Sequence, residues 1–169
     1  MTAFILVFAL GLLAPSWADA QTRGASAPGA APAISGMRAH LFQNKTGQLS
    51  GDVLDATRGD SWNGIAGPKA SNATLIVIEV SGPPGGTFTG HFGPQTKSSV
   101  RLVARETGRI PRLLLDITQV VPVLTDEGKG YLAFLVYQSG CAQLRLTATI
   151  VGLGAAKPME RSLNFACGE

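Results

Sequence analysis

The chain has few of the residues that most enzymes use for catalysis. Its 169 residues include only two cysteines and two histidines, and His40 and His91 are far from both cysteines in the sequence. No G-x-S-x-G nucleophile elbow, H-E-x-x-H zinc motif or Cys–His signature is present. Two distant histidines do not form a chelating pair, so we expect neither a transition-metal site nor a cofactor. These absences exclude enzymes with a local catalytic motif, but not an enzyme whose catalytic residues meet only in the fold.

Helical and membrane-spanning patterns are also absent. No stretch has the 3.6-residue apolar period of an amphipathic helix. The apolar run from Ala3 to Ala14 has about a dozen residues, whereas a membrane span needs about 20. Pro15 and the small-x-small sequence Ala18-Asp19-Ala20 follow this run, as in a signal peptidase site. We interpret residues 1–20 as a cleavable signal peptide, with an uncleaved anchor helix as the alternative. This predicts a periplasmic or secreted protein with no membrane span after cleavage.

The segment after the signal peptide contains almost no large apolar side chains. Residues 21–35 consist mainly of Ala, Gly, Pro and Ser, and such a stretch cannot bury enough surface to offset its ordering entropy. We therefore expect a flexible leader over 21–35 and a single globular domain over 36–169. Cleavage would leave 14 basic and 10 acidic residues, because Asp19 is removed. The net positive charge of the mature chain favours acidic partners in a general way only.

Short strand patterns, separated by Gly- and Pro-containing turns, fill the rest of the chain. Residues 98–106 alternate, with Val100, Leu102 and Ala104 on one face and Arg101, Val103 and Arg105 on the other. This is the period of a half-buried strand. Further strands are expected at 37–43, 48–54, 73–80, 87–92, 112–121, 131–138, 143–152 and 162–167. The spacing favours an all-β fold of about eight strands, which we interpret as a β-sandwich with immunoglobulin-like architecture.

The two cysteines are expected to form one disulfide bond. In an oxidising compartment an isolated pair, Cys141 and Cys167, most simply forms an intramolecular bridge. In the chain-entropy model such a loop stabilises a fold by about 3–4 kcal/mol. Cys141 falls in the turn of an expected hairpin and Cys167 ends the last expected strand, so the bridge would prevent fraying there. Trp62 precedes both cysteines, so the Cys…Trp…Cys order of immunoglobulin domains is missing and the likeness is architectural only.

The longest irregular segment, residues 55–72, is a candidate binding loop. Trp62 could stack on a sugar or a peptide there, or it could fold back as a lid on the core. The tripeptide Arg58-Gly59-Asp60 has the sequence by which some extracellular proteins engage integrins, although so short a motif is weak evidence by itself. Asp52, Asp55 and Asp60 could approach Ca²⁺. Their spacing is not that of an EF-hand loop, so we expect a solvated turn rather than a metal site.

Arg101, Arg105, Arg109 and Arg112 form a second candidate binding surface. Arg101 and Arg105 are expected on one strand face, about 13 Å apart at about 3.3 Å per residue. This basic stripe could meet an anionic envelope polymer or an acidic protein, or it could simply protect an exposed strand from aggregation. Because no aromatic residues are interleaved with the arginines, we expect no nucleic-acid partner.

We therefore expect an exported, non-catalytic binding module for a protein or glycan partner in the cell envelope or the extracellular space. Its candidate binding residues are Trp62, Arg58, Asp60, Arg101 and Arg105. Strand addition to an exposed sheet edge is a further mode that such folds offer. The alternatives are a small secreted hydrolase, with His40 or His91 contacting a carboxylate and a hydroxyl, and a structural subunit of a cell-surface assembly.

Overall fold

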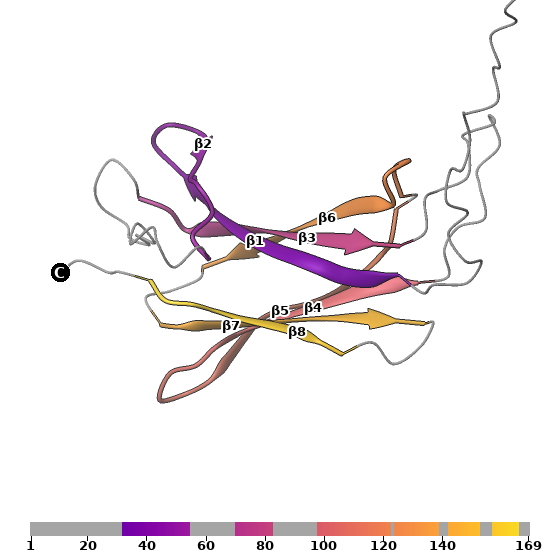
Figure 1. The fold of residues 1–169 in the computed structure, drawn as a ribbon. Helices are drawn as coiled ribbons and strands as arrows, with labels where there is room; N and C mark the ends of the chain where they lie inside the picture. The colour runs from indigo at the N-terminus through magenta and orange to yellow at the C-terminus, as the bar shows by residue number, and fades with distance from the viewer. Residues whose placement is uncertain are drawn as a thin grey trace, which may run out of the picture.

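The computed structural model describes residues 32–54, 70–82, 98–122, 124–138, 142–152 and 157–165. Eight strands form two antiparallel sheets that face each other, and none of these residues is helical (Figure 1). The strands are β1 (Ala33–Gln43), β2 (Gln48–Leu49), β3 (Ala73–Ser81), β4 (Ser99–Glu106), β5 (Arg112–Val120), β6 (Lys129–Tyr137), β7 (Leu144–Val151) and β8 (Met159–Leu163). The first sheet has the order β2-β1-β3-β6 and the second the order β5-β4-β7-β8. The expected all-β fold is confirmed, and the two layers have the arrangement of a sandwich.

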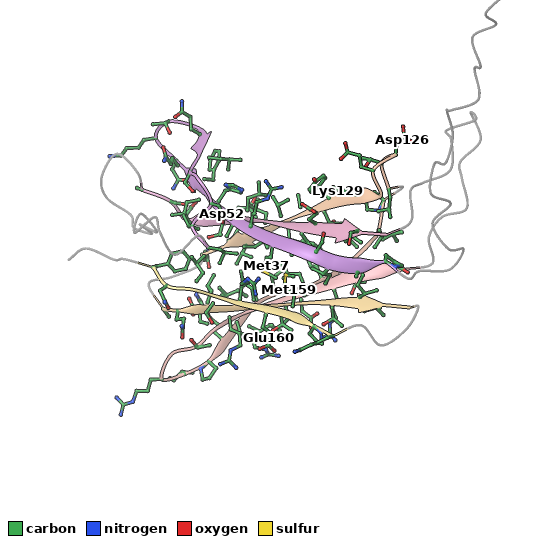
Figure 2. The ribbon with its side chains drawn as sticks, in the orientation of Figure 1. Met37, Asp52, Asp126, Lys129, Met159 and Glu160 are labelled. Carbon is green, nitrogen blue, oxygen red and sulfur yellow. The ribbon has the colours of Figure 1, made fainter. Side chains whose placement is uncertain are left out.

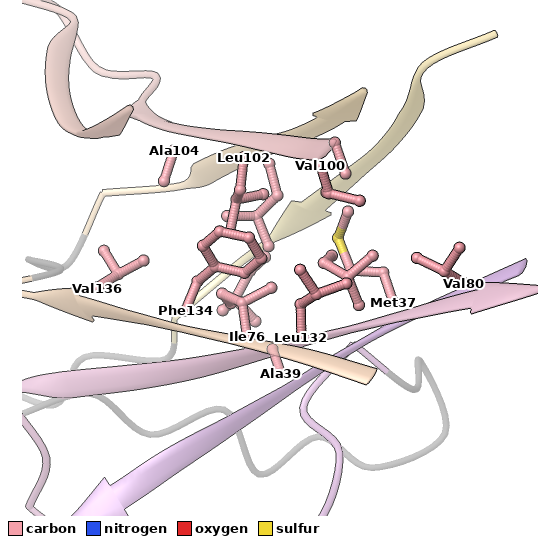
Figure 3. Close-up of a cluster of buried hydrophobic side chains, with 14 of the residues drawn as sticks. Met37, Ala39, Ile76, Val80, Val100, Leu102, Ala104, Leu132, Phe134 and Val136 are labelled. Carbon is pink, nitrogen blue, oxygen red and sulfur yellow. The ribbon is translucent and has the colours of Figure 1, made fainter. Parts of the chain in front are cut away.

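The inner faces of the two sheets meet in one apolar core. Buried residues alternate with more exposed ones along β4, β6 and β7, as the period of two requires. Phe134 of the first sheet extends toward Leu102 of the second, and both are almost completely buried (Figure 3). Met37 and Met159 also lie between the sheets (Figure 2). The inward face predicted for residues 98–106 is confirmed.

The edge of β1 is capped by the segment that follows β2. Ala39 N donates to Asp52 Oδ1 at 3.0 Å, and Leu41 N donates to Ser50 Oγ at 2.8 Å. In return, Val53 N donates to the Ala39 carbonyl at 2.8 Å and Ser50 N to the Leu41 carbonyl at 2.9 Å. Figure 2 shows Asp52 beside β1. Two side-chain and two backbone hydrogen bonds thus replace a partner strand here, and they satisfy an edge that would otherwise invite pairing with another chain.

A side chain also covers part of the opposite edge of the first sheet. Gln119 Nε2 on β5 donates to the carbonyl of Ala133 on β6 at 3.0 Å, which links the two sheets along this seam. Arg112 Nη2 donates to the Gln138 carbonyl at 3.0 Å, just after β6 ends. The edge strand β5 ends at Val120, two residues before Pro122, as the sequence predicts for this proline.

Several strand boundaries differ from the sequence prediction. β1 begins at Ala33, three residues before the expected start of the domain, because Ala33 and Ile34 pair with the end of β3. β2 has two residues, since the chain after Leu49 turns to cap β1 with side chains. β8 starts at Met159, earlier than expected, because its pairing with β7 extends to Ala148. The turn at 44–47 is confirmed, with Gly47 at a φ of 68°, and the strand expected at 87–92 lies outside the described residues.

The hairpin expected around Cys141 is wrong. β6 pairs with β3 in the first sheet and β7 pairs with β4 in the second, so the connection between β6 and β7 crosses from one sheet to the other. The two apolar runs are adjacent in sequence, but each completes a different layer of the core. Sequence proximity of two strong strands therefore did not determine their pairing.

Removal of the Phe134 ring should destabilise the fold strongly. We expect Phe134→Ala to lower the free energy of unfolding by about 3–5 kcal/mol, because the cavity lies between two packed sheets. Phe42→Ala is the matched control, since Phe42 lies on the outer face of the first sheet and is partly exposed. Urea unfolding followed by circular dichroism measures both. Equal losses in the two variants would contradict the described position of the core.

Candidate functional site on the outer face of the first sheet

Three of the predicted binding residues cannot be placed. Trp62, Arg58 and Asp60 fall within 55–69, outside the described residues. The chain enters this segment after Leu54 and returns at Ala70, which is buried and whose carbonyl accepts a hydrogen bond from Asn44 N at 3.0 Å. The prediction of a binding loop around Trp62 therefore stays a prediction.

In the expected basic stripe, Arg101, Arg105, Arg109 and Arg112, two arginines form ion pairs. Arg101 forms two hydrogen bonds to Asp116 on β5, Nε to Oδ1 at 2.7 Å and Nη2 to Oδ2 at 2.6 Å. Arg112 likewise binds both carboxylate oxygens of Glu106, at 3.0 and 3.1 Å. Arg105 lies on the same outer face as Arg101, as predicted, but forms no ion pair with a described residue. Two of the four arginines are therefore already neutralised by carboxylates of their own sheet.

The Arg101–Asp116 pair also shifts the titration of both groups. The hydrogen bonds from Arg101 lower the pKa of Asp116, and the charges of Arg101 and Arg105 lower it further, although partial desolvation opposes this. The same interactions raise the pKa of Arg101. Both side chains are solvent-exposed to a large extent, so the pair contributes little to stability at ordinary salt.

The titration of Asp116 should report this pair directly. Its stabilising effect is fully present above the ordinary aspartate pKa of about 3.9 and is lost as the pH falls through the lower pKa of the folded protein. We expect the Asp116 carboxyl carbon to titrate below that ordinary value in an NMR pH series. Arg101→Met should move the pKa back upward, and Arg161→Met should leave it unchanged. An identical Asp116 titration with and without Arg101 would contradict the described hydrogen bonds.

The outer face of the first sheet is apolar at one end. Phe42, Leu49, Leu135 and Tyr137 remain 39, 51, 38 and 63% exposed. They lie together because Phe42 pairs with Leu49 on one side and with Ala73 on the other, and Ala73 in turn pairs with Tyr137. In the neighbouring row, Leu75 pairs with Leu135. Large apolar side chains from four strands thus gather where an outer sheet face usually carries polar residues.

A hollow with a volume of about 370 Å³ lies in this face. It is lined by Phe42, Asn44, Leu49, Asn72, Ala73, Leu75, Leu135 and Tyr137. The small side chain of Ala73 lies in the row between Phe42 and Tyr137, whose strands are about 10 Å apart, or two strand spacings. The volume falls within the range of ligand pockets, about 300–1,000 Å³. The arrangement provides an apolar depression between two aromatic rings.

Besides the Tyr137 hydroxyl, the polar side chains that line this hollow are those of Asn44 and Asn72. Their backbones are fixed, since Asn44 N donates to the Ala70 carbonyl at 3.0 Å and the Asn72 carbonyl accepts from Gln138 N at 2.8 Å. Neither side-chain amide bonds to a described residue. Both amides can therefore donate to and accept from a ligand.

Comparison of the chain with protein-family models, with curated proteins and with solved structures found no match. The function has to be inferred from the residues of this surface and from the rest of the fold.

The histidine that the structure describes is engaged with the backbone. His40 Nδ1 lies 3.0 Å from the Ser50 carbonyl oxygen, while the Ser50 hydroxyl accepts from Leu41 N and donates to the Gly51 carbonyl. Within the described ranges, no three His, Cys, Asp or Glu side chains are placed to hold a metal ion. The same residues contain no helix that is long and apolar enough to cross a membrane. His91 lies outside them.

The apolar face was not predicted from the sequence, although the sequence carries a signal for it. Residues 73–80 and 131–137 are almost continuously apolar instead of alternating, which is typical of strands whose two faces both avoid water. In this domain one face of β3 and β6 forms the core, and the other forms part of the hollow. A run of this kind predicts a second contact surface.

Proposed function

We propose that this chain is an exported, non-catalytic binding module whose partner is a protein, and that the hollow on the first sheet accepts an apolar side chain of that partner. The observation that carries the proposal is the group of exposed apolar residues around Ala73, with Phe42 and Tyr137 on either side. Contiguous exposed apolar surface on a small domain marks an interaction site. Aromatic residues are also enriched at protein interfaces.

The face of the first sheet is better suited to binding than its edges. The Asp52 and Ser50 side chains occupy the amides of β1, and Gln119 occupies a carbonyl of β6. A partner strand would have to displace these bonds before it could pair. A side chain that enters the hollow displaces only water, and this burial is favourable in proportion to the apolar area removed from water.

The lining favours a protein over a glycan. Leu49, Leu75 and Leu135 offer aliphatic surface with no polar atoms, which suits an apolar side chain. A glycan is the second candidate, because a sugar ring can stack on Tyr137 while the amides of Asn44 and Asn72 bond to its hydroxyls. Export itself is supported by the signal-peptide pattern of residues 1–20.

The two tyrosines of β6 allow a matched test. Tyr131 and Tyr137 lie on the same face of one strand, but Tyr131 is at the far end, where the guanidinium carbon of Arg38 lies 5.8 Å from its ring centroid. We expect peptides selected from a random display library on residues 21–169 to share an apolar anchor. Tyr137→Ala should weaken their binding at least about tenfold, a loss of about 1.4 kcal/mol. Tyr131→Ala should leave it unchanged.

Titration calorimetry measures both variants, and a glycan array on the same protein provides the second arm. Selected peptides without an apolar anchor, or peptides that bind Tyr137→Ala as well as the unmodified protein, would overturn the proposal. Glycan binding that Tyr137→Ala abolishes would replace the protein partner with the second candidate.

We also infer an immunoglobulin-like type of sandwich. If β2 is left aside, the remaining strands in chain order correspond to A, B, C, C′, E, F and G of that fold. The sheets then have the orders A-B-E and C′-C-F-G. These are the neighbours that strands A, B and E and strands C′, C, F and G have in immunoglobulin domains. The strand order supports this type independently of the cysteine pattern.

The Cys141–Cys167 disulfide is a further part of this proposal. Both cysteines lie outside the described residues, but the register of the last two strands supports the pairing. Leu144 pairs with Leu163. In the sequence, Cys141 is three residues before Leu144 and Cys167 is four residues after Leu163. An antiparallel register brings two such positions to the same end of the sheet.

Oxidised protein should be two hydrogen masses lighter than the reduced protein by mass spectrometry. Cys141→Ser with Cys167→Ser should lower the free energy of unfolding by about 3–4 kcal/mol, because the reduced unfolded chain gains loop entropy. Unfolding of the unmodified protein with and without reductant gives the same comparison on one sequence. Free thiols in freshly secreted protein would contradict the bridge.

A further inference from the structure

We propose that Arg105 and Arg145 form a binding site for a phosphate monoester on the outer face of the second sheet. The two arginines come from strands that are 40 positions apart in the sequence, and the pairing of β4 with β7 brings them directly opposite each other. Cross-strand partners have their Cβ atoms about 4.5–5.5 Å apart. Both side chains are exposed. The site lies on the opposite side of the sandwich from the hollow and does not depend on its function.

Two like charges directly opposite each other destabilise a sheet. Nearby carboxylates relieve this repulsion only in part. Asp116 attracts Arg105 through space, but it is hydrogen-bonded to Arg101, and Glu106 is bound to Arg112. Neither Arg105 nor Arg145 forms an ion pair with any described residue. The sheet therefore retains two adjacent guanidinium groups that form no ion pair, and an anion would stabilise both.

Two of the surrounding side chains can donate hydrogen bonds, and the exposed Leu113 on β5 pairs with Arg105 on the other side. The hydroxyl of Ser162 lies across from Arg145 on β8. Just before β7, Gln143 Oε1 accepts a hydrogen bond from Thr107 Oγ1 at 2.9 Å, so the Gln143 amide nitrogen keeps its donors free. Two carboxylates also lie near the site. Asp116 is within reach of the charge of Arg105, and Figure 2 shows Glu160 on the side of β8 away from the first sheet. It pairs with Thr147, one step along from Arg145.

The two positive charges of the arginine pair favour a doubly charged anion as the ligand. One arginine satisfies one carboxylate with a two-pronged bond, as Arg101 does with Asp116. Two adjacent guanidinium groups carry two positive charges and several forked donors, which match the three terminal oxygens of a phosphate monoester near its second ionisation. A phosphodiester or a carboxylate has one negative charge and uses only half of the site.

The test uses methyl phosphate as the monoester probe, with dimethyl phosphate and acetate as the singly charged probes. Residues 21–169 are titrated with each probe at constant ionic strength, and binding is followed by amide and guanidinium NMR shifts. Methyl phosphate should shift Arg105 and Arg145 and bind at least about tenfold more tightly than either singly charged probe. Phosphatidylcholine vesicles with and without phosphatidic acid then distinguish a lipid-borne monoester from a soluble one.

Three variants and one control distinguish binding at this site from a general effect of positive charge. Arg105→Gln and Arg145→Gln should each weaken methyl phosphate binding about tenfold, and Glu160→Gln should tighten it. Arg161→Gln is the matched control, because it removes the same charge from the same sheet, at a residue that pairs with the buried Leu146. It should leave binding unchanged.

A second readout does not depend on the probe. At low salt, Arg105→Gln should raise the unfolding midpoint, since it removes the repulsion from Arg145, while Arg161→Gln should not. Equal binding losses in Arg161→Gln and Arg105→Gln would reduce the effect to general charge and overturn the proposal. Equal affinities for methyl phosphate and acetate would do the same.

Discussion

Contact between the inner faces of the two sheets determines which side chain of every strand reaches solvent. Phe134 and Leu102 are buried from opposite layers, and a one-residue slip of either strand would turn them outward. Because side chains alternate with a period of two, the register that buries the core also fixes both outer faces. The hollow around Ala73 and the pair Arg105–Arg145 are consequences of the same register.

The two outer faces of the sandwich differ in character around the two proposed sites. The outer face of the first sheet is apolar around Ala73, whereas the outer face of the second carries arginines, acids and hydroxyls. Within the second sheet, the Arg101–Asp116 ion pair contributes little to stability, but it determines which arginines remain without an ion pair. It occupies the Asp116 carboxylate, and Arg105 consequently remains opposite Arg145 without forming an ion pair.

The sequence predicted features that depend on local pattern. Alternation over 98–106 correctly gave the inward and outward faces of β4, and Gly47 was correctly assigned to a turn. Features that depend on pairing between distant segments were not predicted. The position of Arg145 opposite Arg105 follows from the β4–β7 pairing, and the separation of β6 from β7 follows from each strand completing a different sheet. The hollow could have been predicted from the almost continuously apolar run at 73–80, because a strand with two apolar faces does not alternate.

Placing the two surfaces on opposite sides of the core has a physical consequence for binding. Substitutions at Tyr137 and at Arg145 are on different sheets, with the buried layer of Phe134 and Leu102 between them. Changes at distant sites with no shared partners usually add independently. A packed core of this kind keeps the faces at a fixed separation. An apolar partner on one side and an anionic group on the other would thus bind without competing, and the domain would hold them at a constant distance.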